Sequence, residues 1–295
     1  MSSPRWALRH TLLPLVLALW HCAPAVAQVD PWEFEVYPYL TEPRGTLEVE
    51  SLNSYVAAGH RTPGLGTSSG IYPSQGIAYN ALEFTYGLTD RIEAAAYIDL
   101  AKPDGVDYRI AGGKFRLRGQ FFDQSALPVD LGWYAEFEEH VIPAFDQQRY
   151  EIEVRPIIEK DIGRFSLQIN PIFEKAILGG PEAANAPGFG YAVGAYYRWK
   201  PELSPGLEAY GGAGQISNFT PINQEQHYLF SVVWGELRNG LEYNFGVGFG
   251  LTPGSDHVIV KFNLGLERFI GTLFGASSAD PKPAVSPRRR NDEAP

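Results

Sequence analysis

The sequence predicts an all-β protein, an antiparallel transmembrane β-barrel of about 12 strands. The first observation is a period-two pattern in segments of about ten residues. From 241 to 249 every odd-numbered residue is apolar and the others are Glu, Asn or Gly, and 257–268 repeats this alternation. Successive side chains leave opposite faces of a strand, and about ten residues let a tilted strand cross a bilayer. One apolar face and one polar face are typical of a barrel with lipid outside and water inside.

The second observation is an alternation of connection lengths. The strand candidates are 46–57, 76–87, 91–100, 108–118, 128–138, 148–158, 164–174, 188–199, 206–216, 224–235, 239–250 and 257–268. Every second connection is short, with 119–127 as the exception, whereas 58–75 and 175–187 are long. An even strand number and short periplasmic turns agree with each other. A soluble β-sandwich, the alternative, would explain the turns but not the long strands with aromatic faces.

The N-terminus predicts a secretory signal peptide over residues 1–27. Arg5 and Arg9 precede an apolar core at 11–20, and a small-x-small site predicts cleavage after Ala27. Export together with the strand pattern predicts the outer membrane of a Gram-negative cell. The only cysteine, Cys22, lies within this segment, so disulfides and thiolate metal sites are excluded from the mature chain. A lipoprotein using Cys22 is disfavoured because bulky residues precede it.

Two further segments flank the predicted barrel at 46–270. Residues 28–45 are predicted to be a periplasmic leader, with entry into the barrel mouth or an extra strand as alternatives. Residues 271–295 are predicted to be a disordered C-terminal tail, because they are rich in Pro, Ser and charge without periodicity. The arginines at 288–290 are interpreted as part of a solvated tail rather than as a contact for anionic lipid or peptidoglycan.

The candidate functional residues are charged side chains predicted to face the lumen. They are Glu93, Lys114, Arg116, Arg118, Asp130, Glu136, Glu138, Glu151, Glu153, Arg155, Arg198, Glu208 and Glu242. Cross-strand ion pairs that set register are favoured over a polarised constriction that filters solutes by charge. The expected pairs are Arg118 with Asp130 and Arg198 with Glu208.

Four of these candidates form an acidic cluster on one predicted hairpin: Glu136, Glu138, Glu151 and Glu153. The predicted bases are too few to pair with all four, which motivates the hypothesis of a hydrated vestibule that attracts cations. Unchanged ion selectivity after replacing Glu136 and Glu151 with Gln would count against it. The predicted outward aromatic residues, several near strand ends, are Trp133, Tyr197, Trp199, Trp234, Tyr243 and Phe249.

Enzymatic signals are weak, so no enzyme, metal or cofactor is predicted. His227 and Ser231 are the only His–Ser combination near catalytic spacing, and we expect them two pleats apart on the inner face. No His, Asp and Glu set has metal-ligand spacing, and no glycine-rich phosphate loop opens a helix. The acidic balance, with a net charge of −10, argues against nucleic acid as a partner.

Residues 86–93, Tyr-Gly-Leu-Thr-Asp-Arg-Ile-Glu, lie within repeated hairpins behind an export signal. This stretch resembles a transporter-like family of outer-membrane barrels labelled "MetA-pathway of phenol degradation". The resemblance implies a channel or transporter for small solutes, aromatic or hydrophobic compounds among them. A non-conducting barrel that acts through its extracellular loops is the alternative, and an outer-membrane lipid-modifying enzyme is the third.

The expected partners are outer-membrane lipids and lipopolysaccharide, the barrel-insertion machinery, and a small-molecule solute that the sequence does not identify. One departure from the usual pattern concerns insertion. The terminal aromatic residue that this machinery reads would be Phe269, yet the predicted tail follows it.

Overall fold

A computed structural model describes residues 29–67, 70–142, 149–178, 185–200, 202–237 and 240–269. The predicted signal peptide at 1–27, the predicted tail at 271–295 and the side chain of Phe269 lie outside this description. Among the described residues, no helix is long and apolar enough to cross a membrane.

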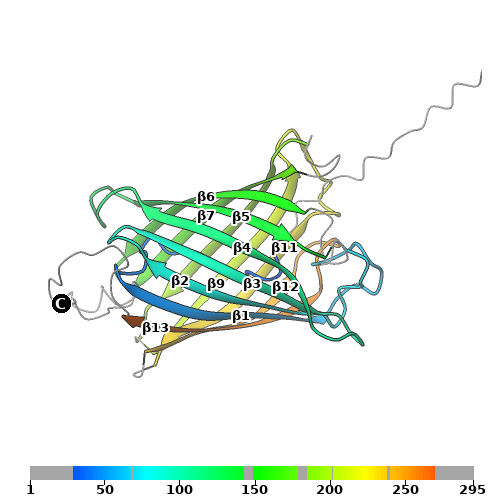
Figure 1. Cartoon of the computed structure of the whole chain (residues 1–295), viewed down its shortest axis with the longest axis horizontal. Helices are drawn as coiled ribbons and strands as arrows, with labels where there is room; N and C mark the ends of the chain where they lie inside the picture. Colours follow the sequence, from blue (N-terminus) through cyan, green and yellow to red (C-terminus); the bar gives the residue numbers. More distant parts are fainter. Residues whose placement is uncertain are drawn as a thin grey trace, which may run out of the picture.

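The chain forms a closed antiparallel β-barrel of twelve long strands, which confirms the predicted fold class (Figure 1). The strands are β1 (Thr46–Ala58), β2 (Ala78–Gly87), β3 (Ile92–Lys102), β4 (Arg109–Gln120), β5 (Asp130–His140), β6 (Tyr150–Ile162), β7 (Phe165–Leu178), β8 (Gly188–Tyr197), β9 (Ser204–Gln215), β11 (Gln226–Glu236), β12 (Leu241–Gly250) and β13 (Val258–Phe269). A two-residue strand, β10 (Asn218–Phe219), pairs only with β9. Pairing of β13 with β1 and of β8 with β9 closes the ring.

The two ends of the barrel differ in the length of their connections. At the end where β1 begins, called the turn end, residues 88–91, 163–164, 198–203 and 237–240 join the strands, and 121–129 remains the longer exception. At the opposite end, called the loop end, the connections are 59–77, 103–108, 141–149, 179–187, 216–225 and 251–257. The turn between β6 and β7 is shorter than predicted because Gly163, with φ of 59°, reverses the chain at once.

The wall of the barrel alternates as the sequence predicts. On β12, Glu242 and Asn244 are buried toward the lumen, whereas Phe245 and Phe249 are exposed on the outer face. The exposed large side chains of the outer face are mostly Phe, Leu, Ile and Val, which lipid can solvate. The polar face therefore lines the inside.

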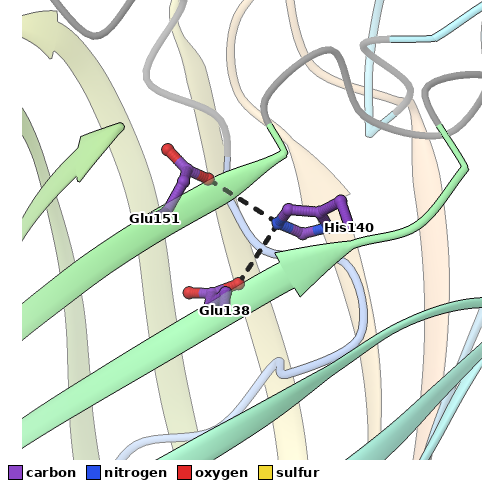
Figure 2. Close-up of side chains that lie close together, drawn as sticks. All are labelled: Glu138, His140 and Glu151. Atoms are coloured by element: carbon purple, nitrogen blue, oxygen red, sulfur yellow. Dashed lines mark ion pairs between the residues drawn. The ribbon is translucent and has the colours of Figure 1, made fainter. Parts of the chain in front are cut away.

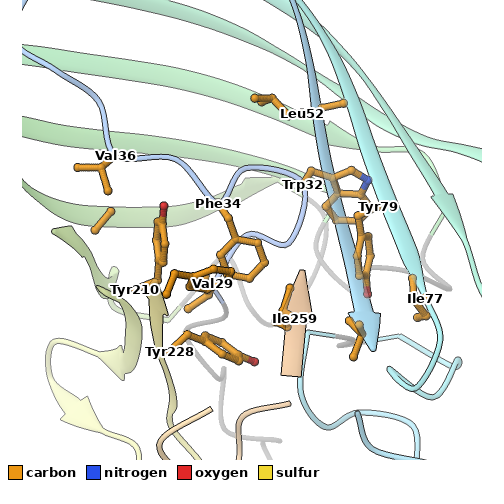
Figure 3. Close-up of a cluster of buried hydrophobic side chains, with 14 of the residues drawn as sticks. Val29, Trp32, Phe34, Val36, Leu52, Ile77, Tyr79, Tyr210, Tyr228 and Ile259 are labelled. Atoms are coloured by element: carbon orange, nitrogen blue, oxygen red, sulfur yellow. The ribbon is translucent and has the colours of Figure 1, made fainter. Parts of the chain in front are cut away.

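The segment predicted to be a periplasmic leader lies inside the barrel instead. Residues 29–45, called the plug segment from here on, are almost entirely buried, and Trp32, Phe34 and Tyr39 are each at most 3% exposed. Figure 3 shows Val29, Trp32, Phe34 and Val36 among side chains from several wall strands. The physical reason is that alternating aromatic residues need a surface to cover them, and the lumen supplies it.

Candidate functional site: the lumen and its plug segment

The plug segment runs the full length of the lumen. At the loop end, the backbone amide of Val29 donates to Gln226 Oε1 at 3.3 Å. At the turn end, the amide of Gly45 donates to the carbonyl oxygen of Gly87 at 2.9 Å, and the chain then enters β1. Residues 29–45 thus thread the barrel from one mouth to the other.

Between Tyr37 and Glu42, the backbone of the plug segment pairs with side chains of the wall. Asn170 brackets Tyr37, accepting from its amide at 2.7 Å and donating to its carbonyl oxygen at 3.1 Å. The amides of Tyr39 and Glu42 donate to Glu159 at 2.7 Å and to Glu93 at 2.6 Å. Buried peptide groups need partners, so these wall side chains satisfy the backbone of an extended segment that joins no sheet.

Glu33 of the plug segment holds two basic side chains of the wall. Its Oε2 lies 3.0 Å from Lys114 Nζ, and its Oε1 lies 3.2 Å from an Arg155 guanidinium nitrogen. The Tyr134 hydroxyl donates to the same Oε1 at 3.2 Å. All three charged side chains are 1 or 2% exposed. We call Glu33, Lys114, Arg155 and Tyr134 the latch.

Two arginines of β4 extend this basic wall toward the turn end. Arg116 donates to Glu83 at 2.6 Å and to the Tyr37 hydroxyl at 2.7 Å, and its guanidinium carbon lies 4.8 Å from the Tyr37 ring centroid. Arg118 pairs with Glu93 at 2.7 Å and donates to the Pro38 carbonyl oxygen at 3.2 Å. Lys114, Arg116 and Arg118 alternate along one strand, so all three face inward.

The opposite wall packs on the plug segment through aromatic rings. Phe34 contacts Tyr210, Tyr228 and Phe230, with ring centroids 5.3, 5.8 and 5.0 Å away. Lys261 forms a fully buried ion pair with Glu208 and donates to the carbonyl oxygen of Phe34 at 2.9 Å. We call Phe34, Tyr210, Tyr228 and Phe230 the aromatic nest.

Two of the cavities within the described part of the chain lie beside the plug segment. The larger has about 590 Å³ of empty space, part of it open to solvent, and is lined by Val36, Pro38, Leu40, Gln124, Glu159, Ser166, Gln168, Tyr196, Arg198, Trp234 and Asn244. The smaller has about 400 Å³, also partly open to solvent, and is lined by Glu35, Tyr37, Pro38, Glu42, Glu48, Glu50, Glu83, Arg116, Arg118 and Glu242. The larger cavity mixes apolar and polar groups, whereas the smaller one carries six carboxylates against two guanidinium groups.

Twelve of the thirteen predicted lumen residues are buried, and Arg198 is partly exposed. Both predicted pairings are wrong. Arg118 lies opposite Tyr134 and pairs with Glu93, while Asp130 accepts from the amide of Ser125. The reason is strand register, because Tyr134 and not Asp130 lies opposite Arg118 on β5, while Glu93 is the direct cross-strand partner of Arg118 on β3.

The second predicted pair fails for the same reason. Arg198 reaches Asp161 at 2.9 Å, and Glu208 pairs with Lys261 instead. Arg198 therefore forms its ion pair at the turn end, whereas Glu208 belongs to the buried ion pair with Lys261 that contacts Phe34.

The acidic cluster on β5 and β6 is covered rather than open, which contradicts a hydrated vestibule. Glu136, Glu138, Glu151 and Glu153 are between 3 and 9% exposed. Lys114 contacts the first two at 3.5 and 3.6 Å, and Arg155 donates to Glu153 at 3.1 Å. Figure 2 shows His140 pointing between Glu138 and Glu151. The plug segment closes this region, because Asp30 and Glu33 share Lys114 with the cluster.

Several residues of the site were not identified from the sequence. They are the plug acids Asp30, Glu33, Glu35 and Glu42, the wall residues Glu83 and Lys261, and the tyrosines Tyr37, Tyr97 and Tyr134. Residues 28–45 contain more acidic than basic side chains. This excess could have indicated that the plug acids contact the basic side chains predicted to face inward.

Two orientation predictions on β11 are also wrong. Trp234 lines the larger cavity rather than the outer face. His227 and Ser231 lie on the outward face, between the buried residues Tyr228, Phe230 and Val232. The cause is the run Leu-Phe-Ser-Val-Val-Trp at 229–234, in which both faces are mostly apolar and the alternation cannot be assigned.

Comparison with known proteins agrees with this architecture. No protein-family model matches the chain, and no curated protein matches it. The COG4313 outer membrane channel from Pseudomonas putida F1 is similar, with a TM-score of 0.54 and 12% identity over 79% of this chain and 100% of that one. At this identity the likeness shows the fold alone. The protein thus shares the β-barrel fold of that outer-membrane channel.

Two weaker likenesses lie below a TM-score of 0.5 and carry no argument. One is a mutant of the TodX monoaromatic hydrocarbon channel, with a TM-score of 0.38 and 8% identity over 76% of this chain and 90% of that one. The other is outer membrane phospholipase A from Escherichia coli, with a TM-score of 0.39 and 10% identity over 82% of this chain and 98% of that one. The family predicted from residues 86–93 stays a prediction.

Proposed function

We propose that this protein is a channel for small solutes in the cell outer membrane, with its turn end in the periplasm and its lumen regulated by the plug segment. The observation that carries the proposal is a closed barrel whose charged lumen is filled by residues 29–45 and not by side chains of the wall alone. A plug held by polar contacts can leave, because water can replace each of those contacts.

The cavities support a solute class. The larger one places Val36, Leu40 and Trp234 beside Gln168 and Asn244, a lining that suits a small solute with both apolar and polar parts. Aromatic compounds, which the resemblance to the phenol-degradation family implies, fit this description. The carboxylates of the smaller cavity favour cationic over anionic solutes on that path.

The geometry around His227 favours a channel over a lipid-modifying enzyme. Its Nε2 lies 2.7 Å from Glu225, and its Nδ1 lies 3.0 Å from the Tyr191 hydroxyl. Both ring nitrogens are therefore engaged, and neither contacts a serine hydroxyl that it could activate. Lipid hydrolysis by the purified protein would reverse this preference.

The proposal is tested by single-channel recording in planar bilayers. The mature chain is compared with a variant lacking residues 28–42 and with Arg91→Gln, a control at an exposed ion pair with Asp123 on the turn end. We expect small or rare conductance steps for the mature chain and the control, and large stable steps for the deletion. Heat-modifiable migration in gels confirms that each variant is a folded barrel. A folded deletion variant that stays silent would overturn the channel and favour a non-conducting barrel that acts through its loops.

A further inference from the structure

Glu138, His140 and Glu151 converge at the loop end of the lumen (Figure 2). Glu138 and Glu151 are direct cross-strand partners on β5 and β6, and His140 follows two residues later on the same face. His140 Nε2 lies 3.5 Å from Glu138 Oε2 and 3.7 Å from Glu151 Oε2, and one ligand atom from each residue lies within 4.8 Å of the others. Paired strands hold these side chains, so the geometry does not depend on a loop.

The spacing suits metal ligands better than hydrogen bonds. An N–H···O hydrogen bond joins atoms 2.7–3.2 Å apart, and both distances to Nε2 exceed that range. Around a tetrahedral ion with ligands about 2.0–2.1 Å away, neighbouring ligand atoms lie about 3.3–3.4 Å apart. The observed 3.5 and 3.7 Å therefore need only a small contraction to surround an ion.

The charge balance nearby also favours a cation. Lys114 is the nearest base to Glu138, at 3.6 Å, but the same ammonium lies within 3.5 Å of Asp30, Glu33 and Glu136. Lys114 is thus shared among four carboxylates, of which Glu33 also contacts Arg155, and Glu151 adds a fifth carboxylate to this corner of the lumen. Buried carboxylates without sufficient positive charge are costly, and a divalent ion offsets that cost.

The donor set selects the class of ion. One imidazole nitrogen with two carboxylate oxygens suits zinc and similar first-row divalent metals, whereas calcium and magnesium prefer oxygen ligands alone. We propose that Glu138, His140 and Glu151 form a binding site for a divalent transition metal of the zinc class at the loop end of the lumen. The side chains are 7 to 11% exposed, so an ion can reach them from that mouth with little rearrangement.

The test is titration of the detergent-solubilised mature protein with Zn²⁺ by calorimetry, after treatment with a chelator. We expect one site per chain, and an affinity at least about 10- to 100-fold weaker in His140→Ala and Glu151→Gln. Glu151 is the cleaner carboxylate to change because Glu138 also contacts Lys114, at 3.6 Å. A Co²⁺-loaded sample provides a second readout, since its visible spectrum reports tetrahedral coordination and the spectrum should vanish in His140→Ala.

Two histidine variants serve as matched controls. His227→Ala removes an outward imidazole beside Glu225, and His257→Ala removes one ring of the His60–His257 pair, whose centroids lie 5.6 Å apart. Both should keep the affinity of the unchanged protein. Binding that disappears in a control but persists in His140→Ala would overturn the proposal. Absence of Zn²⁺ binding by the folded protein would overturn it too. None of these outcomes depends on whether the barrel conducts.

Discussion

The two walls of the lumen hold the same plug segment by different physics. The wall of β4, β5 and β6 presents Lys114, Arg116, Arg118 and Arg155, and it receives the acids and carbonyl oxygens of the plug. The wall of β9 and β11 presents the rings of Tyr210, Tyr228 and Phe230, which pack against Phe34 of the plug. Residues 33 and 34 are neighbours whose side chains contact opposite walls, so the plug places a charge against one wall and an aromatic ring against the other.

This difference separates the contacts that fix the position of the plug from the contacts that only stabilise its docked state. Ring packing in the aromatic nest tolerates small shifts, because apolar burial is non-directional. The latch does not, because a buried charge that loses its partner is strongly destabilising. We therefore expect the charged wall to set the position of the plug and the aromatic wall to add holding strength.

The largest effect is expected from Glu33→Ala. This change breaks the buried contacts of Glu33 with Lys114 and Arg155, which keep Glu138 and Glu153 among their partners, at a cost of about 3–5 kcal/mol to the docked plug. Since 1.4 kcal/mol is tenfold in an equilibrium, the open fraction in single-channel records should rise roughly 10²- to 10³-fold. An increase below tenfold would mean that the latch is not the main restraint.

A somewhat smaller effect is expected from Phe34→Ala. Removing a buried ring costs about 3–5 kcal/mol in a rigid core, and we expect the low end because the lumen can admit water. The open fraction should rise about 10²-fold, with Phe34→Leu producing much less. If Phe34→Ala opens the channel more than Glu33→Ala, the aromatic wall holds the plug more strongly than the charged wall does.

A finer test is Tyr134→Phe, which removes only the hydroxyl that donates to Glu33 at 3.2 Å. The expected cost is about 1–2 kcal/mol, because a hydrogen bond to a charged group is lost while the ring stays. In combination with Glu33→Gln the two effects should be less than additive, since both act on one contact. If the fold increases of the two single variants simply multiply, the Tyr134 hydroxyl acts independently of Glu33.

The smallest effect is expected from Arg198→Gln. Its pair with Asp161 at 2.9 Å is about 20% exposed and lies at the turn end, where water screens it. The contribution should stay below about 1 kcal/mol, with an unchanged open fraction and a thermal midpoint within a few degrees of the unchanged protein. A strong increase in conductance would instead place Arg198 in the gate of the larger cavity.

Sequence alone was sufficient for the wall of the barrel. The alternation at 241–249 and 257–268 identifies the strands, their inner faces and the closing hairpin, because lipid and lumen select opposite side chains at successive residues. The lumen residues followed from the same rule, since Lys114, Glu136 and Arg155 occupy polar positions of alternating strands. On β11 the rule failed at Trp234, where both faces are apolar.

The position of the plug and the pairing of the charges were decided only by tertiary structure. An alternating segment such as 32–37 has the same pattern whether it is a linker, an edge strand or a plug, and its partners Lys114 and Arg155 lie far along the chain. The pair Arg118–Glu93 depends on the register of β3 against β4, and the pair Lys261–Glu208 depends on the distance between two strands that are not neighbours. A local pattern carries neither quantity, because both arise only when the sheet closes on itself.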